Sequence, residues 1–135
     1  MIAGSTVSAG NTFGETVAVM IDAEDRDPAG LVEHALETSQ PQRVIVIAVV
    51  RPLGFTTDAA IADRYAMRRE RLARRMESIV VALATPELTV QGASLAGASA
   101  GSGKTQRKAA AFGRRHGATL LVRRTATGEV VADEL

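Results

Sequence analysis

The sequence has no cysteine, no tryptophan and no marked excess of charge of either sign. Without cysteine, neither a disulfide framework nor a thiolate metal site can form. The 16 Lys and Arg residues are balanced by 15 Asp and Glu residues, so the formal net charge of the 135-residue chain is only +1. Proteins that coat nucleic acids usually carry a clear positive excess. We therefore expect no nucleic-acid partner.

Long hydrophobic runs are also missing. The longest, Val44 to Val50, and shorter ones such as Val17 to Ile21 are far shorter than the roughly 20 residues that a membrane helix needs. The first 14 residues have neither the charged start nor the apolar middle of a signal peptide. These features predict a soluble, cytoplasmic protein with no membrane partner. We expect residues 1–14 to form a flexible tail and residues 15–135 to form one domain.

Short, continuous apolar runs predict strands that are buried on both faces. We expect such strands over residues 16–21, 43–50, 88–92 and 119–123, and a further short edge strand over residues 129–132. Between them the apolar residues recur at helical spacing. The helices are expected from Asp27-Pro28 to Ser39, over residues 58–84, and over residues 105–116 with Gly117 behind the last turn.

This alternation of strands and helices predicts an α/β fold: a single-domain, open parallel sheet with helices on both faces, similar to a Rossmann fold. Ligands of such sheets bind outside the carboxyl ends of the strands, where the strand order reverses. Here the loops at that edge would be residues 22–25, 50–55, 92–103 and 123–128.

The strand ends and their spacing resemble the universal stress protein family. The similarity covers most of residues 15–124 and depends on three segments: Val17-Ala18-Val19-Met20-Ile21-Asp22, Val46-Ile47-Ala48-Val49-Val50-Arg51-Pro52 and Gly117-Ala118-Thr119-Leu120-Leu121-Val122. The last segment is similar to the family's Ala-Asp-Leu-Ile-Val strand, with Thr119 in place of Asp. The resemblance implies a sheet of five strands and a homodimer, often built through the last strand.

In one branch of the family, the resemblance further implies ATP held at the strand ends, with adenosine contacts that correspond to Asp22 and Val50. The family's glycine signature for the phosphates, Gly-x-x-Gly followed later by Gly-Ser or Gly-Thr, is absent. The corresponding segment, residues 123–132, contains only Gly128. Side chains keep a backbone away from a phosphate and disfavour positive φ. We therefore expect weak or no ATP binding.

A second glycine-rich segment precedes the third helix. Five residues separate Gly97 from Gly103, whereas a P-loop has four between its first glycine and its Gly-Lys pair. A weaker phosphate or sulfate site is predicted from Gly101 and Gly103 at a helix N-terminus beside Lys104. The alternative interpretation is a linker without a ligand.

Other polar patterns favour ordinary surface roles. The acids Asp22, Glu24 and Asp25 lack the later aspartate and lysine of a receiver domain's magnesium site. Arginines recur along the long helix, at Arg64, Arg68, Arg71 and Arg75. Acidic residues share that helix and no stacking aromatic residues accompany it, which favours a solvated face. Neither histidine has a partner at catalytic spacing.

Charge is nevertheless unevenly distributed along the chain. Residues 22–37 contain six acids and one base, whereas residues 101–124 contain seven bases and no acid. Such regions can attract each other or the matching region of a second copy. The favoured alternative is a solvated surface, because charged residues are usually exposed.

Together these patterns predict a non-catalytic stress-response or regulatory module of the universal stress protein type. It would need no cofactor and would act as a homodimer or by binding a protein partner. The alternative, from another class, is an adenine-nucleotide (ATP or AMP) binding protein that uses Asp22 and Val50. A third hypothesis is slow nucleotide hydrolysis, for which the sequence supplies no identifiable base or metal site.

For the assembly, we expect the last segment, residues 129–132, to pair with a neighbouring chain rather than with its own sheet. The reason is the short connection that precedes it, since an exposed strand edge has to be covered or paired. The long helix near Tyr65 and Met76 is the next candidate contact.

Overall fold

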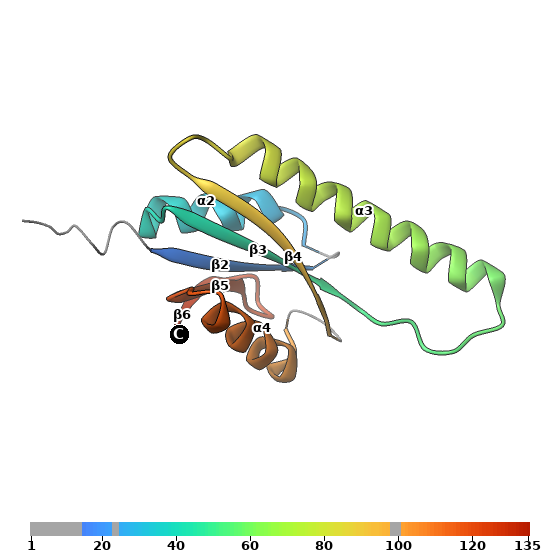
Figure 1. Ribbon diagram of the computed structural model, residues 1–135. Helices are drawn as coiled ribbons and strands as arrows, with labels where there is room; N and C mark the ends of the chain where they lie inside the picture. Colours follow the sequence, from blue (N-terminus) through green and yellow to red (C-terminus); the bar gives the residue numbers. More distant parts are fainter. Residues whose placement is uncertain (1–14, 23–24, 98–100) are drawn as a thin grey trace, which may run out of the picture.

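The computed structural model describes residues 15–22, 25–97 and 101–135. Its strands are β2 (Thr16–Asp22), β3 (Arg43–Val50), β4 (Thr89–Ala96), β5 (Leu120–Arg124) and β6 (Val130–Glu134), and its helices are α2 (Pro28–Ser39), α3 (Ala59–Leu83) and α4 (Gly103–Arg115). The strands form one sheet in the order β4-β3-β2-β5-β6 (Figure 1). Strands β2 to β5 are parallel and β6 is antiparallel to β5. The predicted α/β class, with an open and mostly parallel sheet, is confirmed.

Strands β2 and β3 form the centre of this sheet. They pair in parallel from Thr16 opposite Arg43 to Asp22 opposite Val49, and almost every residue between these ends is buried. Strands buried on both faces have no polar side to present, so their sequences are apolar without alternation. This explains why the two strands were recognisable from the sequence.

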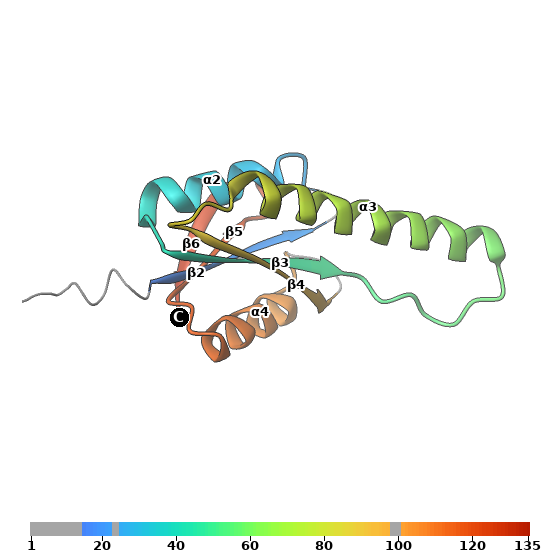
Figure 2. The ribbon, with the colours of Figure 1, turned by 45° about the horizontal axis from the view of Figure 1, so that its top comes forward.

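Helices cover both faces of the sheet, as predicted (Figures 1 and 2). Helices α2 and α3 lie on one face, where Val17, Val19, Ile21, Val44 and Val46 pack against Leu31, Val32, Ala35, Leu72 and Ile79. Helix α4 lies on the other face, where Ala18, Met20, Ile45, Ile47 and Leu121 pack against Ala109. The larger of the two apolar layers therefore lies under α2 and α3.

The helix starts and stops follow local chemistry. The Asp27 carboxylate accepts a hydrogen bond from the Gly30 N–H at 3.0 Å, and Pro28 is the first residue of α2. The Asp58 carboxylate accepts one from the Ala60 N–H at 2.9 Å. Gly117 follows α4 with φ of 85°, a left-handed conformation that glycine adopts without strain. These boundaries agree with the predicted ones to within two residues.

Strand β4 is longer than predicted. It pairs with β3 from Thr89 opposite Arg43 to Ala96 opposite Val50, although residues 92–103 were predicted to be a loop. Ala93 and Leu95 pack against the α4 layer, so the small residues after Gly92 still alternate between the two faces. Gly92 therefore lies inside a strand and away from the carboxyl edge of the sheet.

The last strand corrects the prediction that residues 129–132 pair with a neighbouring chain. Strand β6 pairs with β5 of its own chain, from Leu120 opposite Glu134 to Arg124 opposite Val130. The connection is a tight turn in which the Thr125 N–H donates to the Glu129 carbonyl at 2.7 Å and Gly128 has φ of 90°. An antiparallel hairpin needs only a few connecting residues, whereas a parallel crossover needs a dozen or more. The short connection is therefore sufficient for pairing within the chain.

Helix α3 extends well past the sheet (Figure 1). Its 25 residues correspond to about 37 Å at 1.5 Å per residue. Only its C-terminal half packs on the sheet, where Leu72 and Ile79 are buried. We call residues 51–71 the arm: it consists of the extended segment before α3 and the turns of α3 that lie beyond the sheet. No helix in the described part of the chain combines the length and hydrophobicity that a membrane span requires.

The central position of β3 predicts a large stability loss for Ile47→Ala, because Ile47 is fully buried between the strands and α4. We expect the free energy of unfolding to fall by about 2–5 kcal/mol. Val81→Ala is the matched control, since Val81 is 74% exposed and its loss should change stability by no more than about 0.5 kcal/mol. Urea denaturation measures both. Equal losses in the two variants would contradict the arrangement of the core.

Candidate functional site

The strand order reverses between β2 and β5. From β2 the chain passes to β3 and then β4 on one side, and it returns to β5 on the other side. In open α/β sheets, ligands bind at the carboxyl ends of the strands that flank this reversal. Here those ends are Asp22 in β2 and Arg124 in β5. The site is therefore built around these two strand ends.

The Arg124 side chain bridges the loops that follow these two strand ends. Its Nε lies 3.4 Å from a carboxylate oxygen of Asp25, and its terminal nitrogens donate to the carbonyls of Asp27 at 3.4 Å and Gly128 at 3.1 Å. Arg75, on α3, donates to the Asp25 carbonyl at 3.0 Å. One guanidinium thus joins β5, the turn after it and the loop before α2, and a second one ties that loop to α3.

The ion pair is unevenly exposed. The side chain of Asp25 is only 7% exposed, whereas that of Arg124 is 32% exposed. A carboxylate so far removed from water requires a partner. The pair also joins the acidic region, residues 22–37, to the basic region, residues 101–124. One of the two attractions predicted from the charge distribution, that within the chain, is therefore present.

The two predicted adenosine contacts lie on neighbouring strand ends. Asp22 ends β2 and is opposite Val49, and Val50 ends β3. The Val50 carbonyl accepts a hydrogen bond from the Gly97 N–H at 3.1 Å, and its side chain packs against the layer under α2 and α3. The structure thus brings these two residues to the same edge, as the fold predicts.

The residues after β5 do not fit a triphosphate held in the manner that the family resemblance implies. That manner requires a glycine turn whose N–H groups approach the phosphates closely. Here Arg124, Thr125 and Ala126 lead directly into the β5–β6 hairpin, and the Arg124 guanidinium bonds to Asp25 and to the Gly128 carbonyl. No chemical step through a nucleotide is derived from this arrangement.

The other predicted site residues lie at the start of α4. Gly103 is its first residue, Ser102 is the N-cap without a side-chain capping bond, and Lys104 is exposed. The Gly101 carbonyl accepts from the Gln106 side chain at 3.3 Å. The predicted placement of Gly101, Gly103 and Lys104 at a helix N-terminus is confirmed. Binding of an anion there stays a prediction.

The projection of the arm beyond the sheet was not predicted from the sequence, although the long helix near Tyr65 was named as a candidate contact for the assembly. Apolar residues recur at helical spacing along α3 from Ile61 and Tyr65 onward, which predicts a buried stripe, but Ile61 is 42% exposed because the sheet does not extend beneath it. On the same arm, Phe55 is 97% exposed and Met67 is 60% exposed. The length of the predicted helix could have indicated this projection. A helix of about 37 Å is longer than an eight-residue strand of about 26 Å, so part of it must extend past the sheet.

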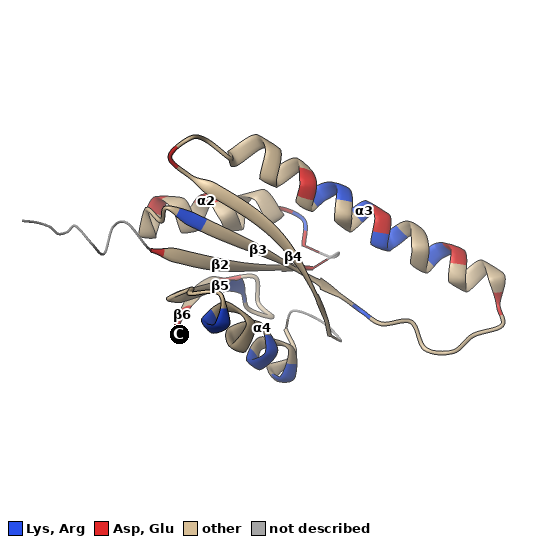
Figure 3. Ribbon diagram, in the orientation of Figure 1, with Lys and Arg blue, Asp and Glu red and all other residues tan. Residues whose placement is uncertain are grey.

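Charge differs between the helices (Figure 3). Helix α4 carries only bases, at Lys104, Arg107, Lys108, Arg114 and Arg115, whereas α3 carries both signs. Within residues 15–22, 25–97 and 101–135, no three His, Asp or Glu side chains gather in a way that would hold a metal ion.

Comparison with known proteins leaves the family open. No family model matches this chain, and no protein of curated function is detectably similar to it. The resemblance to universal stress proteins therefore remains a hypothesis.

Breaking the Arg124–Asp25 pair should cost more than breaking an exposed pair. Arg124→Met leaves the Asp25 carboxylate buried without its counter-ion, so we expect stability to fall by about 1–3 kcal/mol. The double variant Arg124→Met/Asp25→Asn should lose less than the sum of the two single variants. Arg107→Met is the control, because Arg107 is exposed on α4 and its loss should change stability by no more than about 0.5 kcal/mol. Additive losses in urea denaturation would show that Arg124 and Asp25 do not interact.

Proposed function

We propose that this protein is a non-catalytic regulatory module of the universal stress protein type, which acts by dimerisation and by binding a partner protein through the arm. The observation that carries the proposal is the exposure of large apolar side chains on the arm, led by Phe55 at 97%. Scattered apolar residues are normal on surfaces, but a group of them on one projecting element favours a binding role.

The arm has the composition of a protein-binding surface. Leu53, Phe55, Ile61 and Met67 are exposed, and residues 51–71 contain five arginines against three acidic residues. Aromatic residues, Met and Arg are enriched in protein interfaces. The partner that fits is a protein with an apolar groove flanked by carboxylates, which would receive Phe55 and pair with the arginines.

The carboxyl edge of the sheet supports a role without a nucleotide. At the ends of β2 and β5, where a ligand of such a sheet would bind, Arg124 bonds to the loop before α2. A phosphate at this position would compete with the Asp25 carboxylate, whose side chain is 7% exposed, for the Arg124 guanidinium. This favours the regulatory function over the adenine-nucleotide alternative.

A thermal-shift assay tests the nucleotide alternative. A ligand at a hundred times its Kd stabilises the native state by about 2.7 kcal/mol, which would raise the melting temperature by several degrees. With ATP, ADP or AMP at 1 mM, with and without Mg²⁺, we expect no such rise. Arg124→Met is the informative comparison, because it removes the guanidinium that bonds to Asp25. A clear rise with the wild-type protein would favour nucleotide binding.

Photocrosslinking tests the arm. With Phe55 replaced by p-benzoylphenylalanine, we expect one discrete product with a second protein, because the side chain projects into solvent from the arm. The same replacement at Ala111, exposed on α4, is the control and should not give that product. The linked protein, identified by mass spectrometry and purified, should bind the wild-type chain at least about tenfold more tightly than Phe55→Ser. Equal crosslinking at both positions would argue against the arm.

A further inference from the structure

The two edges of the sheet differ in how they are protected. Strand β6 has Asp133 and Glu134 among its five residues. Strand β4, at the other edge, has eight residues with no charge and no proline. Charges, prolines and covering elements are the usual means by which proteins keep an edge strand from pairing. In the described part of the chain, no strand pairs with the outer side of β4.

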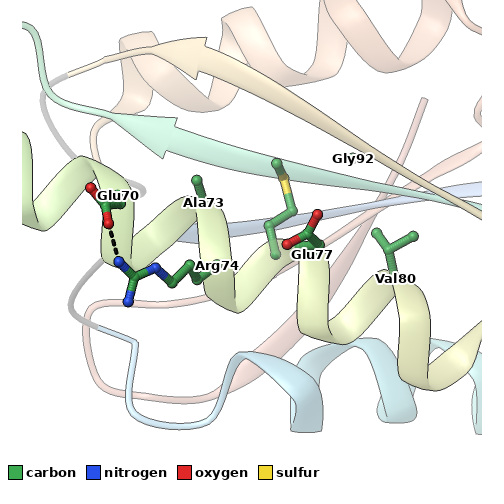
Figure 4. A pocket seen from close by; sticks show the side chains of 7 residues that line it. Glu70, Ala73, Arg74, Glu77, Val80 and Gly92 are labelled. Atoms are coloured by element: carbon green, nitrogen blue, oxygen red, sulfur yellow. Dashed lines mark hydrogen bonds and ion pairs between the residues drawn. The ribbon is translucent and has the colours of Figure 1, made fainter.

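A groove of about 370 Å³ lies between α3 and the β4 edge (Figure 4). Ala73, Met76 and Val80 of α3 give it an apolar wall, and Gly92 of β4 borders it. A Cβ atom on Gly92 would lie 3.0 Å from the Met76 sulfur, so the missing side chain lets Met76 lie directly over the strand. The middle of β4 and the middle of the groove therefore coincide.

We propose that the β4 edge and this groove bind a second copy of the chain, with β4 pairing antiparallel to its counterpart across a two-fold axis. The proposal depends on the dimeric function proposed above and assigns its interface. An antiparallel pair of identical strands has two-fold symmetry, so the same surface is used by both copies. Because the axis is perpendicular to the sheet, the two α3 helices lie on the same face and run antiparallel.

The spacing of the elements fits this arrangement. Helix α3 packs over both β3 and β4; an axis midway between the two strands is about 2.4 Å inside β4, half the strand spacing. The two-fold axis would lie about 2.4 Å outside β4, half the spacing of the new strand pair. The two α3 axes would then be about 10 Å apart, within the usual range for packed helices. The walls of the two grooves would meet without a gap.

The charges that line the groove complement themselves under the same symmetry. Glu70, Arg74 and Glu77 follow one another along α3, and Arg74 pairs with Glu70 in the monomer. A two-fold axis beside Gly92 also passes beside Met76, which lies over it. Reversal of α3 about a point between Arg75 and Met76 sets Arg74 of each copy opposite Glu77 of the other.

This complementarity selects a second copy over another occupant. An extended peptide from another protein would satisfy the β4 backbone, but it would bring no matched charges to α3. A second copy supplies the strand, the apolar wall and the opposite charges at once.

Sedimentation velocity at micromolar concentration tests the strand contact. Ser94 is exposed on β4 two residues from Gly92, and Ser94→Lys would bring an ammonium group into the strand contact, where it loses water, which disfavours association. We expect the wild-type protein to be a dimer and Ser94→Lys to be a monomer. Ala132→Lys is the matched control, since Ala132 is exposed on the β6 edge, and it should stay dimeric. A native circular dichroism spectrum and a cooperative melting transition of Ser94→Lys would exclude unfolding as the cause.

A charge exchange tests the helix contact. Arg74→Glu and Glu77→Arg should each weaken the homodimer, whereas a mixture of the two variants should give a heterodimer, because each then faces the opposite charge. The double variant Arg74→Glu/Glu77→Arg should dimerise again. If the single substitutions only disturbed the folding of each chain, mixing the two variants would not restore a dimer.

The outcomes separate the two proposals. If Ala132→Lys dissociates the dimer and Ser94→Lys does not, the assigned interface is wrong and the dimeric function stands. If the wild-type protein is a monomer throughout, both the interface and the dimerisation are overturned, while the crosslinking at Phe55 still decides the binding of a partner protein.

Discussion

The burial of β2 and β3 on both faces is the constraint on which the rest of the structure depends. Two strands made only of apolar residues at their centre must be covered by helices on each side of the sheet. The chain meets this requirement with α2 and α3 on one face and α4 on the other. The coverage is unequal. Strands β5 and β6 and the carboxyl edge of the sheet are held by ion pairs.

Ion pairs connect two parts of the sheet and its loops. On the α4 face, the outer strands β5 and β6 are joined by Arg123 and Asp133, whose side chains are 2.6 Å apart. At the carboxyl edge, Arg124 and Arg75 hold the loop before α2 through Asp25. Both contacts occupy positions where a larger α/β domain would have more chain. These contacts connect the outer strands and the carboxyl edge of the sheet without a ligand. This is why we favour a binding role for the arm over a ligand site at the strand ends.

Much of the fold was predictable because its signals are local. The apolar runs of β2 and β3, the Asp27-Pro28 helix start and the Gly117 helix stop each depend on a few adjacent residues. The length of β4 was not predictable in this way, because Gly92 and Ser94 are poor strand formers that pair only because β3 provides eight partners. Likewise, the periodicity of α3 predicts a buried stripe but carries no information about where the sheet beneath it ends. The placement of Asp22 and Val50 on one edge followed from the fold class, whereas the closure of that edge by Arg124 depends on contacts between residues about a hundred positions apart.

The adjacency of β2 and β5 has a consequence for how the protein is made. Val17 lies opposite Leu120, so the first strand of the sheet finds one of its two neighbours only after most of the chain has left the ribosome. Contacts between such distant residues form slowly, because a long loop must close before they contribute. Strands β2, β3 and β4 can associate earlier, with one side of β2 still open. During synthesis the exposed edge would therefore be that of β2, in the centre of the mature sheet, and its protection would depend on how soon β5 arrives.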